Sequence, residues 1–522
     1  MSMQILSEIL KARVAESGER IFCSFQDQQM TFKELYDRVQ EVAGALVEAG
    51  IEPGDRVGLM LNSSLEHIEL YLAIAWLGAI SVPISVHLKS AGLELLFNSC
   101  SPRLVVAERR YADAIRQAAS ETVSSPSVAW LEDGTNGPGE FHLNGLLRTS
   151  RAVRNAVIRS FDDPFMISYT SGTTGGPKGA IISERYRWVG CKSAAIISDA
   201  QPDDTYLLWE SFYHGAAWVT IEMALRKGLK VHMVERFSAS RLWDQIAEGG
   251  VTKLHYTGGV VNIILAQPPV ESERSNTVSI AWGAACPADS WRKFEERFQL
   301  KVREGYGLSE GQNFTHMNLR GVVGSCGLPI EELDSWIADQ NGDRVGPGVV
   351  GEIVLKQKIP GITMTGYWGE PEKTAEVLRN GCVFTGDLGM VDDENYFYFK
   401  GRKKDALRRR GQNISAWEVE RVLNASPDVE ESAVIGVDSG LGDHDQDILA
   451  VVTLRDGAKQ DPIAILKFCA EQLAYYQVPR FIQFVDAFPR GPTQRIMKKH
   501  ISVDLEKAWD AEKAGVKPTR TA

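Results

Sequence analysis

The thirteen residues SYTSGTTGGPKGA, from Ser168 to Ala180, place four glycines and one lysine among several hydroxyl side chains. Glycine allows backbone N–H groups to approach an anion closely, hydroxyls donate further hydrogen bonds, and Lys178 adds a positive charge. The stretch therefore predicts a phosphate-binding loop. The alternative is a flexible surface turn without a ligand.

This loop is not the P-loop of the common nucleoside triphosphatases. That pattern requires a glycine before the lysine and a serine or threonine after it to hold Mg²⁺. Here Pro177 precedes Lys178 and Gly179 follows it. The apolar residues 180–183 then stand where a helix should begin. We therefore expect a phosphate site of another class.

The composition is that of a globular protein with several folding units. The 522 residues are 44% hydrophobic and 24% charged, and the formal net charge is −11. A single core rarely grows to this size, so about two to four folding units are expected. The acidic balance argues against nucleic acid as the main partner.

The cysteines and apolar runs favour a cytoplasmic protein. No CxxC pair occurs among the seven cysteines, so we expect free thiols rather than disulfides or a metal site. Charged residues from Glu8 to Glu16 argue against a secretory signal. The longest charge-free apolar run, residues 70–86, contains Gly78 and Pro83, so it predicts a helix, a turn and a strand. We expect no stable membrane insertion.

Helical and strand patterns alternate through most of the chain. Residues 31–50 carry apolar side chains at a helical period, and residues 56–64 follow as a short buried strand. Such alternation predicts an α/β fold with largely parallel sheets. Charge becomes dense at residues 401–411, which open an α+β tail. We predict a large N-terminal domain of residues 1–401 and a small C-terminal domain of residues 402–522 that rotates about a hinge near Lys404.

Four later stretches follow the loop in a recognisable order. They are GYGLSE (305–310), FTGD (384–387), GRKKDALRRRGQNISAWEVE (401–420) and FPRGPTQRIMKK (488–499). Together with the loop they resemble the motifs of the adenylate-forming superfamily, which contains acyl-CoA ligases, carrier-protein adenylation domains and firefly-type luciferases. Several separated motifs in one order are far more specific than any one of them.

The resemblance implies a two-step reaction that uses ATP, Mg²⁺ and coenzyme A. A carboxylate attacks the α-phosphate of Mg-ATP and gives an acyl-adenylate and pyrophosphate, and the thiol of CoA then displaces AMP. It also implies a nucleotide site in which Glu310 binds Mg²⁺, Tyr306 stacks on adenine, and Asp387 and Arg402 hold the ribose. The remaining residues implied at this site are Thr170, Ser171, Gly172, Thr173, Thr174, Lys178, Gly283, Ala284, Ala285, Glu304, Gly305, Gly307 and Ser309.

Residue types alone leave some of these roles open. A planar base buries well between a ring such as Tyr306 and a flat peptide without side chains. A lone buried tyrosine is otherwise a core residue. A carboxylate beside phosphates suits Mg²⁺, a hard cation. Asp387 follows Thr-Gly, which is also good turn chemistry.

The basic run after the predicted hinge has two interpretations. Arginine forks suit phosphates, so Arg408 and Arg410 are candidates for contact with CoA, and Gly411 would let the loop approach its pantetheine arm. The alternative is a solvated hairpin that includes Arg409.

The acyl site has one histidine candidate and several small residues. His214 stands where the superfamily often has an aromatic or histidine beside the acyl channel, although a histidine within the core is the alternative. Five small residues, which are Gly215, Ala216, Gly283, Ala284 and Gly311, would leave volume. We therefore predict a bulky acyl group.

Arg495 occupies the position of a lysine that acts in the first step of the superfamily's reaction. The usual form of this stretch is roughly PTGKIQK, and its first lysine contacts the substrate carboxylate and the α-phosphate. Here Gln494 and Arg495 replace Gly and Lys, and Lys498 matches a later position. Arginine keeps the charge but is bulkier and planar.

This substitution suggests a split activity. Losing a charge-stabilising donor typically costs about 10²–10³ in rate, so adenylation would be impaired while acyl-AMP and CoA still give acyl-CoA and AMP. The reaction then resembles that of the non-adenylating acyl-CoA ligases of diterpenoid antibiotic pathways, and a separate adenylating enzyme would be a partner. Arg495 could equally support an ordinary two-step ligase. Other readings are a protein that loads a carrier domain and a nucleotide-binding pseudoenzyme, and a homodimer is left open.

Overall fold

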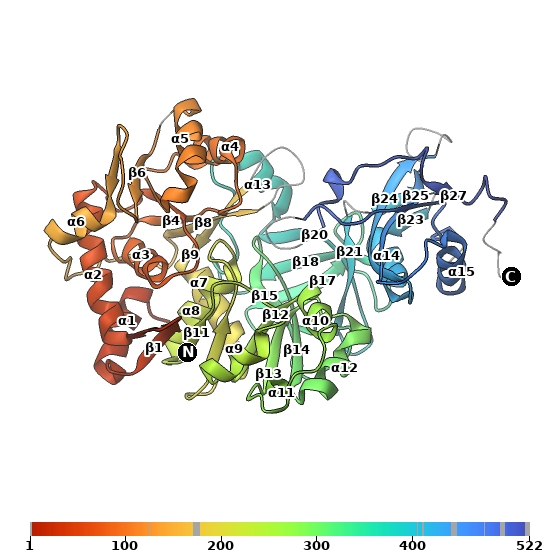
Figure 1. Cartoon of the computed structure of the whole chain (residues 1–522), viewed down its shortest axis with the longest axis horizontal. Helices are drawn as coiled ribbons and strands as arrows, with labels where there is room; N and C mark the ends of the chain where they lie inside the picture. Colours follow the sequence, from red (N-terminus) through yellow and green to blue (C-terminus); the bar gives the residue numbers. More distant parts are fainter. Residues whose placement is uncertain are drawn as a thin grey trace. The chain divides into compact units, whose positions relative to one another are not determined.

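The chain forms two compact units in the computed structural model (Figure 1). Residues 3–123, 125–170, 178–403, 406–409, 412–439, 446–473, 476–490 and 496–516 are described. The first unit contains Met1–Ser335 and Val354–Thr385, and the second contains Trp336–Ile353 and Gly386–Ala522. Compactness thus places the second unit's main segment from Gly386 onward. The predicted domain boundary after residue 401 and the hinge at Lys404, which lies outside the described residues, stay predictions.

A nine-stranded sheet with a parallel centre dominates the first unit. The strands in spatial order are β16 (Leu328–Pro329), β15 (Gln312–Asn318), β14 (Lys301–Leu308), β13 (Ile280–Ala284), β12 (Lys253–Thr257), β10 (Thr205–Leu208), β11 (Lys230–Met233), β1 (Ile21–Phe25) and β2 (Gln28–Thr31). Pairing is parallel from β14 to β1, and the outer strands are antiparallel.

A second, seven-stranded sheet of the same unit carries the predicted loop. Its strands in order are β7 (Glu140–His142), β6 (Ser127–Trp130), β5 (Leu104–Ala107), β3 (Arg56–Met60), β4 (Ile80–Pro83), β8 (Pro164–Thr170) and β9 (Lys178–Ser183). All of its pairs are parallel except β8 with β9. The expectation of largely parallel sheets is confirmed.

Helices of the first unit follow the apolar periods of the sequence. Helix α2 (Phe32–Glu48) begins at a capping box, in which the Thr31 hydroxyl accepts from the Glu34 N–H and the Glu34 carboxylate accepts from the Thr31 N–H. The other helices are α1 (Leu6–Ser17), α3 (Leu65–Trp76), α4 (Ser90–Cys100), η1 (Arg109–Tyr111), α5 (Ala112–Glu121), α6 (Leu143–Thr149), α7 (Glu184–Ile197), α8 (Gly215–Lys227), α9 (Leu242–Gly249), α10 (Gly258–Leu265), α11 (Glu271–Arg274), α12 (Ala288–Phe298) and α13 (Pro371–Val377). The helix, turn and strand predicted over residues 70–86 are confirmed by α3, Gly78 with φ 71° and β4.

Two apolar cores cover the two faces of the nine-stranded sheet. One core joins residues of α7 and α8 to Trp282 of β13 and Phe314 of β15. The other joins α9, α10 and α12 to Leu254 and Tyr256 of β12. Because side chains alternate along a strand, His255 stands on the face opposite to its two neighbours, the face covered by α7 and α8.

A five-stranded sheet contains the points at which the chain passes from one unit to the other. It consists of β17 (Leu333–Ala338), β18 (Gly351–Gln357), β20 (Cys382–Val391) and β19 (Leu378–Arg379), with β21 (Phe397–Arg402) beside β20. The limits of the two units fall within β17, β18 and β20.

The second unit is a small α+β domain. Its further elements are β22 (Ala406–Arg409), β23 (Gln412–Ser415), α14 (Ala416–Ala425), β24 (Val429–Asp438), β25 (Gln446–Leu454), α15 (Pro462–Gln472), β26 (Phe481–Phe484), η3 (Lys498–His500) and β27 (Trp509–Asp510). Helices α14 and α15 share one apolar core with the sheet β24-β25-β26-β27. The predicted fold class, a large α/β body followed by a small α+β domain, is confirmed.

Most thiols of the chain are removed from solvent. All seven cysteines lie among the described residues as free thiols, and six of them are buried. In the part of the chain that the structure describes, none of the helices has both the length and the apolar character needed to cross a bilayer.

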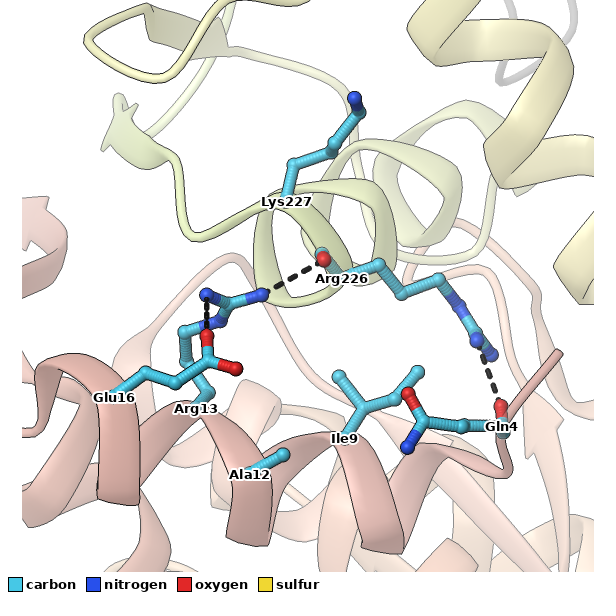
Figure 2. Close-up of a pocket in the computed structure, with 7 residues that line it drawn as sticks. All are labelled: Gln4, Ile9, Ala12, Arg13, Glu16, Arg226 and Lys227. Atoms are coloured by element: carbon cyan, nitrogen blue, oxygen red, sulfur yellow. Dashed lines mark hydrogen bonds and ion pairs between the residues drawn. The ribbon is translucent and has the colours of Figure 1, made fainter. Parts of the chain in front are cut away.

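A small pocket separates α1 from the end of α8 (Figure 2). Its volume is about 150 Å³, and Arg226 Nη1 crosses it to donate to the carbonyl of Gln4 at 2.8 Å. None of the lining residues is a predicted site residue; they are Gln4, Ile9, Ala12, Arg13, Glu16, Arg226 and Lys227. The pocket is therefore a seam between two helices rather than the active site.

A buried carboxylate anchors the start of α1. Glu184, at the first position of α7, accepts a hydrogen bond from the backbone N–H of Leu6. Burial raises the pKa of Glu184 to about 7, although the charges of Arg226 and Arg159 oppose the shift. Protonation is therefore favoured in the folded state relative to the unfolded chain, in which the pKa is near its ordinary value.

We predict that Glu184→Gln flattens the pH dependence of stability. Because the folded-state pKa is raised, the contribution of Glu184 is greatest at low pH, decreases as the pH rises through about 4.5 to 7, and totals roughly 3 kcal/mol. Urea unfolding between pH 4.5 and 8 should show the wild-type free energy of unfolding falling relative to the variant. Glu8→Gln, an exposed change in α1, is the control. Parallel curves for wild type and Glu184→Gln would contradict the prediction.

The middle arginine of the basic run is a core residue of the second unit. Arg409 Nε donates to Asp447 Oδ1 at 2.9 Å, and its Nη1 donates to the carbonyl of Val478 at 2.7 Å. The side chain is 7% exposed, so the solvated hairpin expected for this arginine is wrong. Alternation along β22 turns residue 409 inward, where Asp447 also binds Arg480 at 2.7 Å.

We predict that Arg409→Met destabilises the second unit by about 3–5 kcal/mol, because it leaves a buried carboxylate without one of its charge partners. Chemical denaturation followed by a probe in the C-terminal unit would measure the loss. Lys459→Met, an exposed change in the same unit, should stay within about 0.5 kcal/mol of wild type. Equal effects of the two substitutions would contradict a structural role for Arg409.

Candidate active site

The predicted phosphate loop joins two antiparallel strands. Thr170, the last residue of β8, is the register partner of Lys178, the first residue of β9. A strand rather than a helix follows the lysine, which confirms that the loop differs from the P-loop of nucleoside triphosphatases. Four predicted phosphate ligands, together with the side chain of Thr170, lie outside the described residues; they are Ser171, Gly172, Thr173 and Thr174.

Residues 365–368 bind the free edge of β9. The N–H of Ile181 donates to the Gly366 carbonyl at 2.9 Å, and the N–H of Trp368 donates to the Gly179 carbonyl at 2.8 Å. Ala180 and Tyr367 form an isolated β-bridge between them. This short pairing fixes Tyr367 beside the start of β9, although Tyr367 and β9 are far apart in the sequence.

Lys178, Tyr367 and Glu310 form a cluster at this point. The ammonium of Lys178 lies 5.3 Å from the centre of the Tyr367 ring. The Tyr367 hydroxyl donates to Glu310 Oε1 at 2.6 Å. Burial and the neighbouring carboxylate raise the pKa of Tyr367 well above its usual range. A cation and a carboxylate are therefore held on either side of one phenol, next to the loop of glycines and hydroxyls.

The strand ends that should face adenine are tightly packed. Gly283 and Ala284 of β13 pair with Glu304 and Gly305 of β14. A Cβ on Gly283 would lie 1.9 Å from the Tyr256 carbonyl oxygen, so only glycine fits there. Gly305 and Gly307 are equally enclosed, since an added Cβ would lie 2.4 Å from the Phe314 ring or 2.0 Å from the Asn313 carbonyl oxygen.

Tyr306 is buried between these two glycines. Its ring centre lies 5.6 Å from that of His316, and its carbonyl accepts from Thr315 Oγ1 at 3.0 Å. The structure thus shows a core aromatic in a rigid setting, and stacking on adenine stays a prediction. Ser309 lies in the turn that follows β14, directly before Glu310.

Glu304 holds the backbone that leaves β13. Its carboxylate accepts hydrogen bonds from the N–H groups of Ala285 and Cys286, at 3.0 Å for Cys286, and from the Tyr256 hydroxyl at 2.6 Å. Ala285 has φ 67°, a left-handed conformation that is unfavourable for a residue with a Cβ. Burial raises the pKa of Glu304 to about 8. These hydrogen bonds fix the backbone that we predict lies against adenine, and a contact of Glu304 with the nucleotide stays a prediction.

Asp387 and Arg402 are paired in the second unit. They are register partners on β20 and β21, and Arg402 Nε lies 3.2 Å from Asp387 Oδ1. The turn expected as an alternative for Asp387 is wrong, because the residue lies inside β20 and is buried. Gly386, with φ 68°, provides the bend before it, and its N–H donates to Glu352 Oε1 at 2.9 Å.

The acyl-site candidates differ in how closely they are packed. His214 precedes α8, is half-buried rather than in the core, and stands next to Gly215, whose only neighbour within 4 Å of an added Cβ is Asn313 Nδ2 at 3.1 Å. Gly311 is closely packed: a Cβ added there would lie 2.6 Å from Leu355 Cδ1 and 2.8 Å from Leu308 Cδ2. The volume expected at Gly283 and Gly311 is therefore wrong, because these glycines serve close packing.

Several predicted cations of the C-terminal region lie outside the described residues. They are Lys404, Arg410 and Arg495, together with Gly411 and the side chain of Arg408. Lys498 is described, and its Nζ lies 2.6 Å from Glu420 Oε1. This lysine is thus bound within the second unit.

Sequence reasoning missed three residues of these clusters. Tyr367 stands in an aromatic stretch, and the preceding Gly366 was the one local feature that could have drawn attention to it. Glu210 and His255, which contact each other, were likewise not predicted. A carboxylate two residues after the apolar strand β10 was the available signal.

The carboxylates present suit a Mg²⁺ that arrives with a nucleotide. Among the described residues, no group of three or more histidines, cysteines, aspartates or glutamates is placed to hold a metal ion. Mg²⁺ bound by one or two carboxylates and substrate phosphates needs no such cage. The single carboxylate of Glu310 beside the phosphate loop fits that arrangement.

A lysine-bearing loop between antiparallel strands, a carboxylate beside it and a following α+β unit define the adenylate-forming class of enzymes. The chain belongs to the AMP-binding enzyme family: residues 10–368 match the family described as AMP-binding enzyme, and residues 418–495 match the AMP-binding enzyme C-terminal domain. Its relatives identify it as an enzyme of the acyl-CoA ligase branch.

The similarity extends over nearly the whole chain. A long-chain-fatty-acid–CoA ligase of Mycobacterium tuberculosis, FadD13, is 30% identical over 483 residues, which are 90% of this chain and 92% of the relative. A feruloyl-CoA synthase from an Amycolatopsis species is 29% identical over 90% of this chain and 93% of its own. The crystal structure of ATP-bound MatB from Rhodopseudomonas palustris superposes with a TM-score of 0.86 at 27% identity, covering 95% of this chain and 97% of MatB.

We predict that Tyr367→Phe weakens Mg-ATP binding. The substitution keeps the ring beside Lys178 but removes the hydroxyl that orients Glu310, a hydrogen bond to a charged group worth about 1.5 kcal/mol or more. Calorimetric titration with Mg-ATP should show a dissociation constant raised roughly tenfold. Tyr36→Phe in α2 is the matched control. An unchanged constant in Tyr367→Phe would separate this phenol from the nucleotide site.

Proposed function

We propose that this protein joins a bulky carboxylic acid to CoA through an acyl-adenylate, and that its own adenylation step is slow. The observation that carries the ligase reaction is the cluster of Lys178, Tyr367 and Glu310 beside the phosphate loop. It supplies a cation for phosphate oxygens and a carboxylate for Mg²⁺ at one place. Family membership over both parts of the chain supports the same reaction.

In the first step the acid attacks the α-phosphorus of ATP and pyrophosphate leaves. Lys178 would neutralise the phosphates and Glu310 would hold Mg²⁺, which spreads the charge that develops on the leaving group. Tyr306 and the backbone after β13 would seat adenine. Asp387 would accept from the ribose hydroxyls, and its pairing with Arg402 keeps both polar groups on one side of their strands. Thr170, Ser171, Thr173 and Thr174 would donate to phosphate oxygens.

In the second step the thiol of CoA attacks the acyl carbon and AMP leaves. The C-terminal domain would rotate about Lys404 and bring the segment after it to the CoA side. Arg408 and Arg410 would bind CoA phosphates, and Gly411 would leave space for the pantetheine arm. Because this step does not use residue 495, it would proceed without the usual lysine.

The first step lacks its usual ammonium. Arg495 stands at its position. Lys498, three residues later, does not offer a substitute, because its ammonium is paired with Glu420 at 2.6 Å. Glu420 Oε1 also accepts from the backbone N–H of Val434 at 2.6 Å, so the pair belongs to the domain's own structure. Losing a donor to the developing charge costs about 10²–10³ in rate, of which a displaced arginine would recover a part. The protein would then chiefly convert acyl-AMP and CoA to acyl-CoA and AMP, with the acyl-adenylate supplied by a separate adenylating enzyme.

The start of α8 supports an acid larger than acetate. Gly215 and Ala216 are small and half-buried. His214 would stand beside the acyl group there. The filled positions at Gly283 and Gly311 make no contribution to this volume.

We predict that Arg495→Lys increases ATP–pyrophosphate exchange by roughly tenfold or more, because it returns a compact ammonium to the reacting carboxylate and α-phosphate. Exchange is measured across an acid library with radiolabelled pyrophosphate. Arg490→Lys, the same chemical change at an arginine paired with Glu431, is the control and should leave exchange unchanged.

The products separate the proposal from other reactions. Mass spectrometry of mixtures with premade acyl-adenylates should show acyl-CoA and AMP in the wild type. Brisk exchange by the wild type would instead indicate an ordinary two-step ligase. Transfer to a carrier protein in preference to CoA, or nucleotide binding with no thioester, would overturn the proposed acceptor or the activity itself.

A further inference from the structure

A buried histidine in the middle of β12 contacts a glutamate that lies just beyond the carboxyl end of β10. His255 lies on β12, and Glu210 follows β10 by two residues. His255 Nδ1 contacts Glu210 Oε1, and the two side chains are only 7% and 4% exposed. In α/β sheets, ligands bind beyond the carboxyl ends of the strands. The reaction proposed above assigns no role to this pair.

The surroundings fix the orientation of the pair. Trp209 Nε1 donates to the carbonyl of His255 at 2.9 Å, and the N–H of Trp209 lies 3.3 Å from Glu210 Oε2. The indole of Trp282 stands 4.6 Å from the imidazole at 65°. The ring of His255 is thus held by its own strand, by one carboxylate and by one aromatic wall.

The carboxylate also determines what the other side of the imidazole can bind. With Nδ1–H donating to Glu210, neutral His255 presents Nε2 as a hydrogen-bond acceptor. Among the residues that the structure describes, none is a partner of Nε2. A ligand group that donates a hydrogen bond would satisfy Nε2.

The pair lies on the side of the sheet where the acyl group is expected. His255 pairs in register with Trp282, whose side chain belongs to the core covered by α7 and α8. The chain that leaves Glu210 reaches His214 and the start of α8 four residues later. Trp282 is followed by Gly283, where the predicted nucleotide site begins.

The carboxylate partner distinguishes His255 from other histidines buried in the first unit. His67, another buried histidine of the first unit, has a backbone carbonyl rather than a carboxylate at Nδ1: this atom lies 3.2 Å from the backbone carbonyl of Asn62, and burial lowers the pKa of His67 to about 3. A carboxylate behind an imidazole is instead a common way to orient a histidine toward a ligand.

The geometry points to His255, oriented by Glu210, as the group that recognises a hydroxyl or amino substituent on the acyl group. The substrate class is therefore a carboxylic acid that carries such a hydrogen-bond donor away from its carboxylate. This inference rests on the proposed function, whose acyl site it extends.

Matched pairs of acyl-adenylates test the inference. Benzoyl, phenylacetyl and octanoyl adenylates are compared with analogues that carry one hydroxyl or amino group, and kcat/KM for CoA thioester formation is measured. Premade adenylates remove the first step from the comparison. The wild type should prefer at least one substituted analogue by roughly tenfold or more, because a site built to bind a donor rejects the analogue that lacks it.

Three variants assign the preference to the pair. His255→Phe should reduce the ratio of substituted to unsubstituted kcat/KM to about one. Because it leaves Glu210 buried without its partner, its melting temperature should also fall. Glu210→Gln keeps the volume and should reduce the ratio by a smaller factor, so it reports on the pair even where His255→Phe does not fold. His67→Phe, at a buried histidine outside the proposed site, should keep the wild-type ratio.

Each result supports or overturns the inference. A wild-type ratio near one for every pair, or a ratio unchanged in both His255→Phe and Glu210→Gln, overturns it and leaves the proposed function intact. No thioester from any adenylate overturns the proposed function and the inference together.

Discussion

The pairing of β9 with residues 365–368 is the constraint on which the candidate site depends. A few backbone hydrogen bonds bring Tyr367 to the strand that begins with Lys178, and the phenol then reaches the carboxylate of Glu310. Without this pairing the edge of the seven-stranded sheet would be open, and the lysine and the carboxylate would have no common neighbour. The same contacts therefore close a sheet edge and assemble charges of opposite sign.

The second unit uses its cations in a different way. Arg409 binds Asp447 and a carbonyl inside the domain, and Lys498 binds Glu420. Both residues lie in stretches whose positive charge suggests ligands. Their geometry shows that a basic run can contain a structural residue directly beside candidates for phosphate contact. A charge count alone does not distinguish the two.

The sequence predicted those features that depend on local pattern. The helix over residues 31–50 follows from its apolar period, and the difference from a triphosphatase loop follows from the apolar residues 180–183 where that loop would have a helix. It failed where the cause lies far along the chain. Glycine at 283 is required by the Tyr256 carbonyl, so its small size does not indicate a pocket. Glu304 acts on residues about twenty positions earlier, which no motif spacing reveals.

The bend that Glu304 holds after β13 has a chemical consequence for the thiol beside it. Cys286 is buried, and that burial together with the adjacent carboxylate raises its pKa above the ordinary range. An acyl-adenylate is a strong electrophile, and the thiolate is the form of cysteine that attacks it. The raised pKa keeps this sulfur in its protonated form, the weaker nucleophile, at the bend that Glu304 holds.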